Sequence, residues 1–91
     1  MANTDSKIQS IIREIEYEMG NERVLAQCFN QHLLDGASEF VLANSRRLMR
    51  EKMQYIRGLA SALKYLGFNV EFDISNGDSS MVRYYDSVKV A

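Results

Sequence analysis

A long amphipathic stretch between Ser38 and Gly67 constrains the fold more than any other feature of the sequence. Its apolar residues recur at helical spacings and form one arc nearly half the circumference wide: Val41, Leu42, Leu48, Met49, Tyr55, Ile56, Leu59, Leu63 and Leu66. At a rise of about 1.5 Å per residue, a helix over 39–66 is about 42 Å long, longer than the diameter of a compact domain of this size. We therefore expect part of this helix to project or to contact another chain.

The N-terminal third carries two further apolar sets with helical spacing. The first marks a helix over 5–19, with residues 1–4 frayed, and consists of Ile8, Ile11, Ile12, Ile15 and Met19. The second has its face rotated by about a quarter turn and consists of Val24, Leu25, Cys28, Phe29 and His32. Because one straight helix cannot bury both faces, we predict a break at Gly20-Asn21 and a second helix over 21–34. A continuous kinked helix is the alternative.

The C-terminal quarter has the two-residue alternation of strands. Phe68, Val70, Phe72 and Ile74 alternate with polar residues, which predicts a strand over 68–74, and a second strand is predicted over 81–90. A hairpin loop of three or five residues places Phe72 opposite Val82 and leaves Ser87–Ala91 without a partner. In that register Tyr84 faces the core, whereas Arg83 and Tyr85 lie outside with Lys89.

These elements predict an α+β fold in a single domain over 1–91: three helices, the third one long, followed by a C-terminal antiparallel β-hairpin. A two-stranded sheet needs cover on its apolar face. The long helix, the overhanging strand and the open hairpin edge are surfaces that a twofold dimer covers readily, so a homodimer is expected. The alternative is a compact monomer in which the long helix bends or ends near Gly58.

Composition limits the class of protein. The chain of 91 residues is 46% hydrophobic and 25% charged, as globular domains are, and it has no apolar run of the roughly 18 residues that a membrane span needs. Its single cysteine, Cys28, cannot form an internal disulfide, which agrees with a reducing compartment. We expect a soluble cytoplasmic protein without membrane contact.

The sequence contains no motif that is specific for catalysis or for a cofactor. Cys28 and His32 are four residues apart on a helix and can reach one metal ion, but a structural zinc site draws four ligands, and a buried cysteine beside a core histidine is the simpler interpretation. The glutamates at 14, 16, 18 and 22 are interpreted as a solvated helix face. The scattered glycines form no phosphate loop or nucleophile elbow. We therefore predict no enzyme activity, no metal and no cofactor.

Charge is distributed unevenly along the chain. Residues 1–35 carry three basic and six acidic groups, residues 36–67 carry six and two, and residues 68–91 carry two and four. The basic middle segment either presents a surface to an anionic partner or matches the acidic first helix within the fold. Lys52 lies inside the apolar arc, where it needs to snorkel or to pair with an acidic residue of the first helix or of a second subunit.

The strongest functional feature is a basic stripe beside the apolar arc of the long helix. Arg46, Arg50, Arg57 and Lys64 lie on it, with Arg47 on its flank, and the strand residues Arg83 and Tyr85 add a cation and an aromatic ring. The stripe and the open strand edge predict a non-enzymatic protein that binds another protein, as an adaptor, inhibitor or regulatory subunit.

The alternative function is a nucleic-acid-binding regulator that follows phosphates with the same stripe. The order of helices followed by a hairpin resembles winged-helix DNA-binding domains in element order alone. The corresponding wing, around Asn76–Ser80, carries Asp78 and no basic residue.

Overall fold

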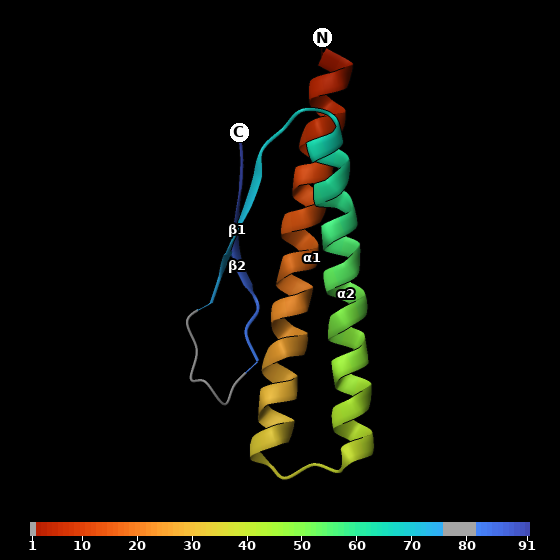
Figure 1. The fold of residues 1–91 in the computed structure, drawn as a ribbon, viewed down its shortest axis with the longest axis vertical. Coiled ribbons are helices and arrows are strands. Elements are labelled where there is room, and N and C mark those ends of the chain that lie inside the picture. The colour runs from red at the N-terminus through yellow and green to blue at the C-terminus, as the bar shows by residue number, and fades with distance from the viewer. Residues whose placement is uncertain (1, 76–81) are drawn as a thin grey trace.

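The computed structural model describes residues 2–75 and 82–91, in which two long helices precede a two-stranded antiparallel sheet (Figure 1). The helices are α1 (Ala2–Leu34) and α2 (Glu39–Tyr65), and the strands are β1 (Val70–Ile74) and β2 (Tyr85–Val90). The helices run antiparallel beside each other, and the hairpin lies along one side of the pair (Figure 1). The α+β class is confirmed, whereas the prediction of three helices is wrong, because 5–19 and 21–34 are parts of one helix.

The continuous α1 is explained by a seven-residue repeat. Its buried positions include Ile8, Ile15, Glu22 and Phe29, each seven residues from the next, and a seven-residue step returns to within about 20° of the same helix face. Glu22 is a charged residue on this line of buried positions. In the sequence, the apolar residues before and after it therefore look like two separate helix faces. Gly20 is exposed, and the helix continues through it despite its low propensity. Residues 2–4, expected to be frayed, belong to α1.

The second helix has the matching repeat. Leu42, Met49, Ile56 and Leu63 are buried at seven-residue intervals and form the seam that packs against α1. Ser38 caps the helix by accepting a hydrogen bond from the backbone N–H of Val41 at 3.3 Å. The molecule is elongated and measures 53 × 23 × 17 Å, so it accommodates the full length of α2. The helix runs beside α1 and does not project alone (Figure 1).

Both turns that end the helices use a glycine in the left-handed region. Gly36 has φ 71° after α1, and Gly67 has φ 97° after α2. The second turn directs the chain into β1, which places Val70 and Tyr85 of the sheet on the core formed by Ile15, Ile56 and Leu63. A smaller core near the α1–α2 turn contains Ala26, Phe29, Leu42 and Met49.

The hairpin register differs from the predicted one. Val70 pairs with Val90 and Phe72 with Val88, and Asn69 and Ala91 exchange two backbone hydrogen bonds of 3.0 Å. The predicted partner of Phe72, Val82, lies outside the ladder, and the C-terminal residues do not overhang. The error is an even shift of six residues, which keeps the same faces opposed, so the alternation of apolar residues cannot detect it. The connection at 76–81, which includes the suggested wing, lies outside the described residues.

A second correction concerns the two adjacent tyrosines. The ladder is irregular between Asp73 and Ile74: Asp73 pairs with Ser87, but Ile74 pairs with Tyr85. The extra residue in β2 changes the face of the sheet on which Tyr85 lies. Tyr85 is therefore buried and stacks on Phe72 with ring centroids 4.5 Å apart, while Ile74 is 55% exposed. The prediction that Tyr85 lies outside is therefore wrong, whereas Tyr84 is half-buried and packs against the smaller core near the α1–α2 turn.

Candidate functional site

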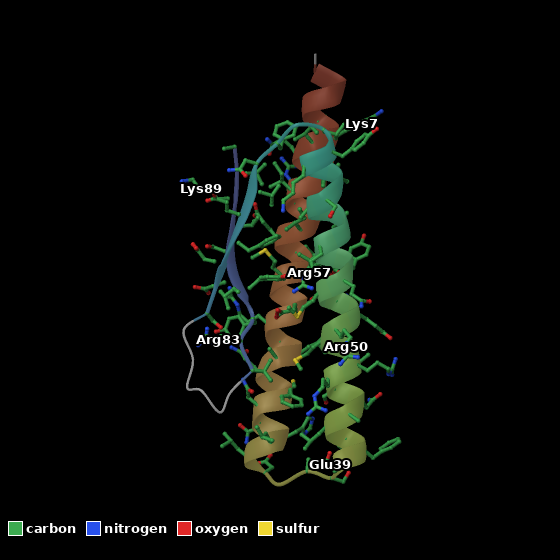
Figure 2. All side chains as sticks on the ribbon, in the orientation of Figure 1. Lys7, Glu39, Arg50, Arg57, Arg83 and Lys89 are labelled. Carbon is green, nitrogen blue, oxygen red and sulfur yellow. The ribbon has the colours of Figure 1, made fainter. Side chains whose placement is uncertain are left out.

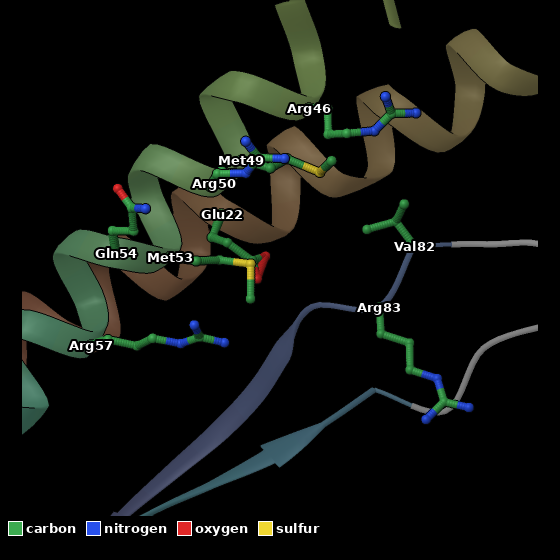
Figure 3. A pocket seen from close by; sticks show the side chains of 9 residues that line it. All are labelled: Glu22, Arg46, Met49, Arg50, Met53, Gln54, Arg57, Val82 and Arg83. Carbon is green, nitrogen blue, oxygen red and sulfur yellow. The ribbon is translucent and has the colours of Figure 1, made fainter. Parts of the chain in front are cut away.

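A cleft of about 370 Å³ lies between α2 and the segment that leads into β2 (Figure 3). We call it the arginine cleft, because four of its nine lining residues are arginines. Its lining residues are Glu22 from α1, Arg46, Met49, Arg50, Met53, Gln54 and Arg57 from α2, and Val82 and Arg83 from the opposite wall. Figure 2 shows Arg50 and Arg57 on α2 and Arg83 on the hairpin side of the molecule.

Two local features bring the walls of the arginine cleft together. Arg46, Arg50 and Arg57 are four and seven residues apart, so they follow one side of the buried seam of α2. The other wall is held by Asn30 of α1, whose side-chain nitrogen donates to the carbonyl of Val82 at 3.2 Å. The amide N–H of Val82 in turn donates to the Asn30 Oδ1 at 2.8 Å. This pair of bonds holds the backbone at Val82 against α1, so that Arg83 belongs to the wall opposite α2, with its side chain directed away from that helix (Figure 3).

The cleft arginines have few partners within the protein. The Arg57 Nε donates to the Tyr85 hydroxyl at 3.0 Å, and the Arg46 guanidinium lies 5.4 Å from the centre of the Phe29 ring. Arg50 and Arg83 make no hydrogen bond or ion pair with another residue in 2–75 and 82–91. Within these ranges, none of the four cleft arginines is paired with a carboxylate. The cleft therefore presents cationic groups that can bind an external anion.

A buried carboxyl group lies among these cations. Glu22 is 1% exposed, and its Oε1 accepts a hydrogen bond from the backbone N–H of Tyr85 at 3.2 Å. Its Oε2 is buried without a hydrogen-bond partner among the described residues. Burial raises the pKa of Glu22, and the bond from Tyr85 only partly opposes this effect. Glu22 thus anchors the start of β2 to α1 and leaves one carboxyl oxygen unused.

The predicted binding residues divide into two groups. Arg46, Arg50, Arg57 and Arg83 line the arginine cleft. Arg47 does not, because it pairs with Glu51 at 3.0 Å and with the Asn44 side chain at 2.8 Å along the surface of α2. Lys64 is exposed in the last turn of α2. Tyr85 is buried below the cleft, where it orients Arg57 instead of offering its ring to a partner.

Internal charge matching accounts for Lys52 but not for the cleft arginines. The Lys52 Nζ lies 2.7 Å from the Glu18 Oε2, with the two side chains 29% and 10% exposed. The hydrogen bond from Lys52 lowers the pKa of Glu18 more than partial burial raises it. Arg23 of α1 forms a further ion pair, with Asp86 at 3.4 Å. Lys52 of the basic middle segment therefore matches the acidic first helix within the fold, whereas the arginines of this segment that line the cleft have no carboxylate partner in 2–75 and 82–91.

Other candidate chemistry is not assembled in the described part of the chain. Cys28 is exposed and His32 is half-buried, and no group of three or more His, Cys, Asp or Glu side chains within 2–75 and 82–91 is arranged to hold a metal ion. Within the same ranges, neither helix combines the length and apolar character required to cross a membrane.

Several cleft residues were missed by reasoning from the sequence, above all Glu22, Met53, Gln54 and Val82. The prediction that Glu22 belongs to a solvated helix face is wrong, because its side chain is buried. The feature that identifies it as buried is its position seven residues after Ile15 and seven before Phe29. The prediction that Val82 belongs to a strand is wrong, because β2 begins at Tyr85, and no local pattern indicates that Asn30 holds the Val82 backbone.

Comparison with protein-family models, curated proteins and solved structures finds no match to this chain. A functional proposal therefore depends on the geometry of its own residues.

Proposed function

We propose that this chain is a small non-enzymatic binding protein whose arginine cleft docks an acidic segment of a partner protein. The observation that carries this proposal is the presence of four arginines on one cleft without a carboxylate partner in 2–75 and 82–91. Guanidinium groups bind carboxylates through paired, charge-assisted hydrogen bonds, so an acidic side chain of a partner supplies the missing anion.

The apolar part of the cleft supports a peptide more than a nucleic-acid backbone. Met49, Met53 and Val82 lie between the arginines, and methionine adapts its shape to different apolar side chains. A segment that alternates acidic and apolar residues matches both components. Lys64, which would extend a track of phosphate contacts along α2, does not line the cleft. An adaptor, inhibitor or regulatory subunit is the class of protein that this arrangement fits.

The composition of the cleft also argues against catalysis. Its described lining contains cations, one buried carboxyl group, an amide and apolar side chains, but no serine, threonine, cysteine or histidine. Nucleophilic catalysis requires a nucleophile within hydrogen-bond reach of a base, and the cleft lining supplies no such pair. Binding without chemistry is the simplest role for these residues.

The test is fluorescence anisotropy with a labelled eight-residue peptide of alternating glutamate and leucine. We expect saturable binding, and we expect Arg50→Glu and Arg83→Glu each to weaken it by about tenfold or more, since each brings a repulsive charge to the cleft. These arginines are chosen because neither has a partner among the described residues. Arg57 is avoided because it holds the Tyr85 hydroxyl.

Arg47→Glu is the matched control, because Arg47 lies on the same helix but outside the cleft. A peptide with glutamine in place of glutamate controls for the apolar contribution. Equal effects of Arg47→Glu and Arg50→Glu, or no binding of the acidic peptide, would overturn the proposal. Tight binding of random duplex DNA or single-stranded RNA that weakens steeply between about 50 and 200 mM salt would instead support the nucleic-acid alternative.

A further inference from the structure

The lining of the arginine cleft contains one carboxyl group whose hydrogen bonding is incomplete. Glu22 is buried, and its Oε1 accepts a hydrogen bond from the backbone N–H of Tyr85 at 3.2 Å. Its Oε2 is also buried and has no hydrogen-bond partner in 2–75 and 82–91. An ionised carboxyl group in this setting is poorly solvated, and a bound proton removes its charge. The cleft lining therefore holds a group that is suited to exchange a proton.

The surroundings of Glu22 act on its affinity for a proton in opposite directions. Burial is the largest influence and raises the pKa of Glu22, whereas the Tyr85 N–H and the neighbouring Arg23 lower it. The four cleft arginines line the same cavity as Glu22, from α2 and from the opposite wall (Figure 3). Their positive charges favour the ionised carboxyl group while the cleft is empty.

An anion in the cleft changes this balance toward the protonated form in three ways. It brings a like charge to a cavity that Glu22 lines, and it neutralises arginines that attract the ionised carboxyl group. It also displaces water from the cavity of about 370 Å³. Each change disfavours a second negative charge in the cleft. Because all three act in the same direction, the sign of the effect does not depend on the pose of the occupant.

No other described residue of the cleft lining changes its charge near neutral pH. Arginine stays protonated, and the remaining lining side chains are neutral. The nearest carboxylates along the chain are paired outside the cleft, Glu18 with Lys52 at 2.7 Å and Asp86 with Arg23 at 3.4 Å. His32, the single histidine of the sequence, does not line the cleft. A proton taken up in the cleft is therefore assigned to its buried carboxyl group.

We propose that Glu22 takes up a proton from solvent when an acidic segment of a partner docks in the arginine cleft, so that docking strengthens as the pH falls. The inference rests on the proposed function. The proton forms an O–H bond on the Glu22 carboxyl group, and no other covalent bond forms or breaks. Occupancy raises the pKa of Glu22 further, so the affinity decreases as the pH rises from the pKa of the empty cleft to that of the occupied cleft.

The experiment is isothermal titration calorimetry of the full chain with the glutamate–leucine peptide, at about pH 6 in two buffers that differ in ionisation enthalpy. The difference between the two observed enthalpies counts the protons taken up on binding. At this pH the glutamates of the peptide are ionised and stay so beside arginine, so that uptake comes from the protein. We expect about half a proton per chain, which corresponds to about threefold tighter binding for each unit by which the pH falls.

Glu22→Gln keeps an acceptor for the Tyr85 N–H but cannot take up a proton. Its proton uptake and the pH dependence of its binding are expected to disappear. Glu16→Gln is the matched control, because Glu16 is exposed on the same helix and does not line the cleft. This variant is expected to retain the native uptake. Circular dichroism melting shows whether both variants fold, and the native measurement gives the sign of the effect without any substitution.

Peptide binding by the native chain without proton uptake, or with proton release, would overturn this inference and leave the proposed function standing. Uptake that persists in Glu22→Gln would also overturn it, since the proton would then belong to another group such as His32. Absence of peptide binding would overturn both proposals.

Discussion

Among single residues, Glu22 shows most clearly how one side chain links the fold to the candidate site. Its position in the seven-residue repeat carries it into the interface between α1, α2 and the start of β2. There it accepts the N–H of Tyr85, whose hydroxyl in turn accepts a hydrogen bond from Arg57. The sequence identified the cleft arginines by their spacing but not this carboxyl group, because a glutamate among other glutamates is typical of a solvated helix face.

The buried carboxyl group predicts a dependence of stability on pH. Burial raises the pKa of Glu22 above its value in the unfolded chain, so folding disfavours the ionised form. The stability contributed by this group is present below the ordinary pKa of an unfolded glutamate and is lost as the pH rises through the folded value. As the pH rises from the unfolded to the folded pKa of Glu22, the Glu22→Gln variant is therefore expected to become more stable relative to the native sequence.

Thermal unfolding of both proteins at a series of pH values measures this difference. Glu16→Gln, an exposed position on the same helix, controls for the loss of one negative charge. A constant difference between Glu22→Gln and the native sequence at all pH values would contradict the assigned burial.

At the scale of elements, spacing predicted the α2 boundaries to within one residue, 39–66 against Glu39–Tyr65. It did so because a capping serine and a left-handed glycine act locally. The predicted break in α1 and the predicted hairpin register are wrong for a different reason, because neither is decided by local signals. Both are decided by contacts between distant segments: α2 supplies the seam that favours a continuous α1, and the asparagine at 30 holds the segment before β2. Single-sequence patterns carry no direct information on such contacts.

Continuity of α1 through Gly20 predicts that Gly20→Ala stabilises the protein. A Cβ atom at this position would meet nothing within 4 Å, and alanine exceeds glycine in helix propensity, so the expected gain is about 0.5–1 kcal/mol. Gly36→Ala is the matched control, because Gly36 also has free space but has φ 71°. That substitution is expected to destabilise the fold by about 1 kcal/mol. Chemical unfolding measures both; a loss of stability in Gly20→Ala would indicate a break in the helix at this glycine.

At the scale of the whole molecule, the candidate site is confined to one side of the helix pair. The hairpin lies along one side of the pair (Figure 1), and the arginine cleft lies between α2 and the segment that leads into β2. The basic stripe was predictable from spacing on α2 alone. The cleft was not, because its second wall comes from Val82 and Arg83, which are near α2 only through the turn at Gly67 and the bonds to Asn30.

The central claim is that the arginine cleft is the place where an acidic segment binds. The most direct measurement is a titration of the isotope-labelled chain with the glutamate–leucine peptide, followed by two-dimensional NMR of the backbone amides and the arginine Nε–H groups. We predict shift changes at Arg50, Met53 and Arg83, with the amides of Leu48 and Tyr55, which do not line the cleft, unaffected. Shift changes centred on Leu48 and Tyr55, or none at saturating peptide, would contradict the account.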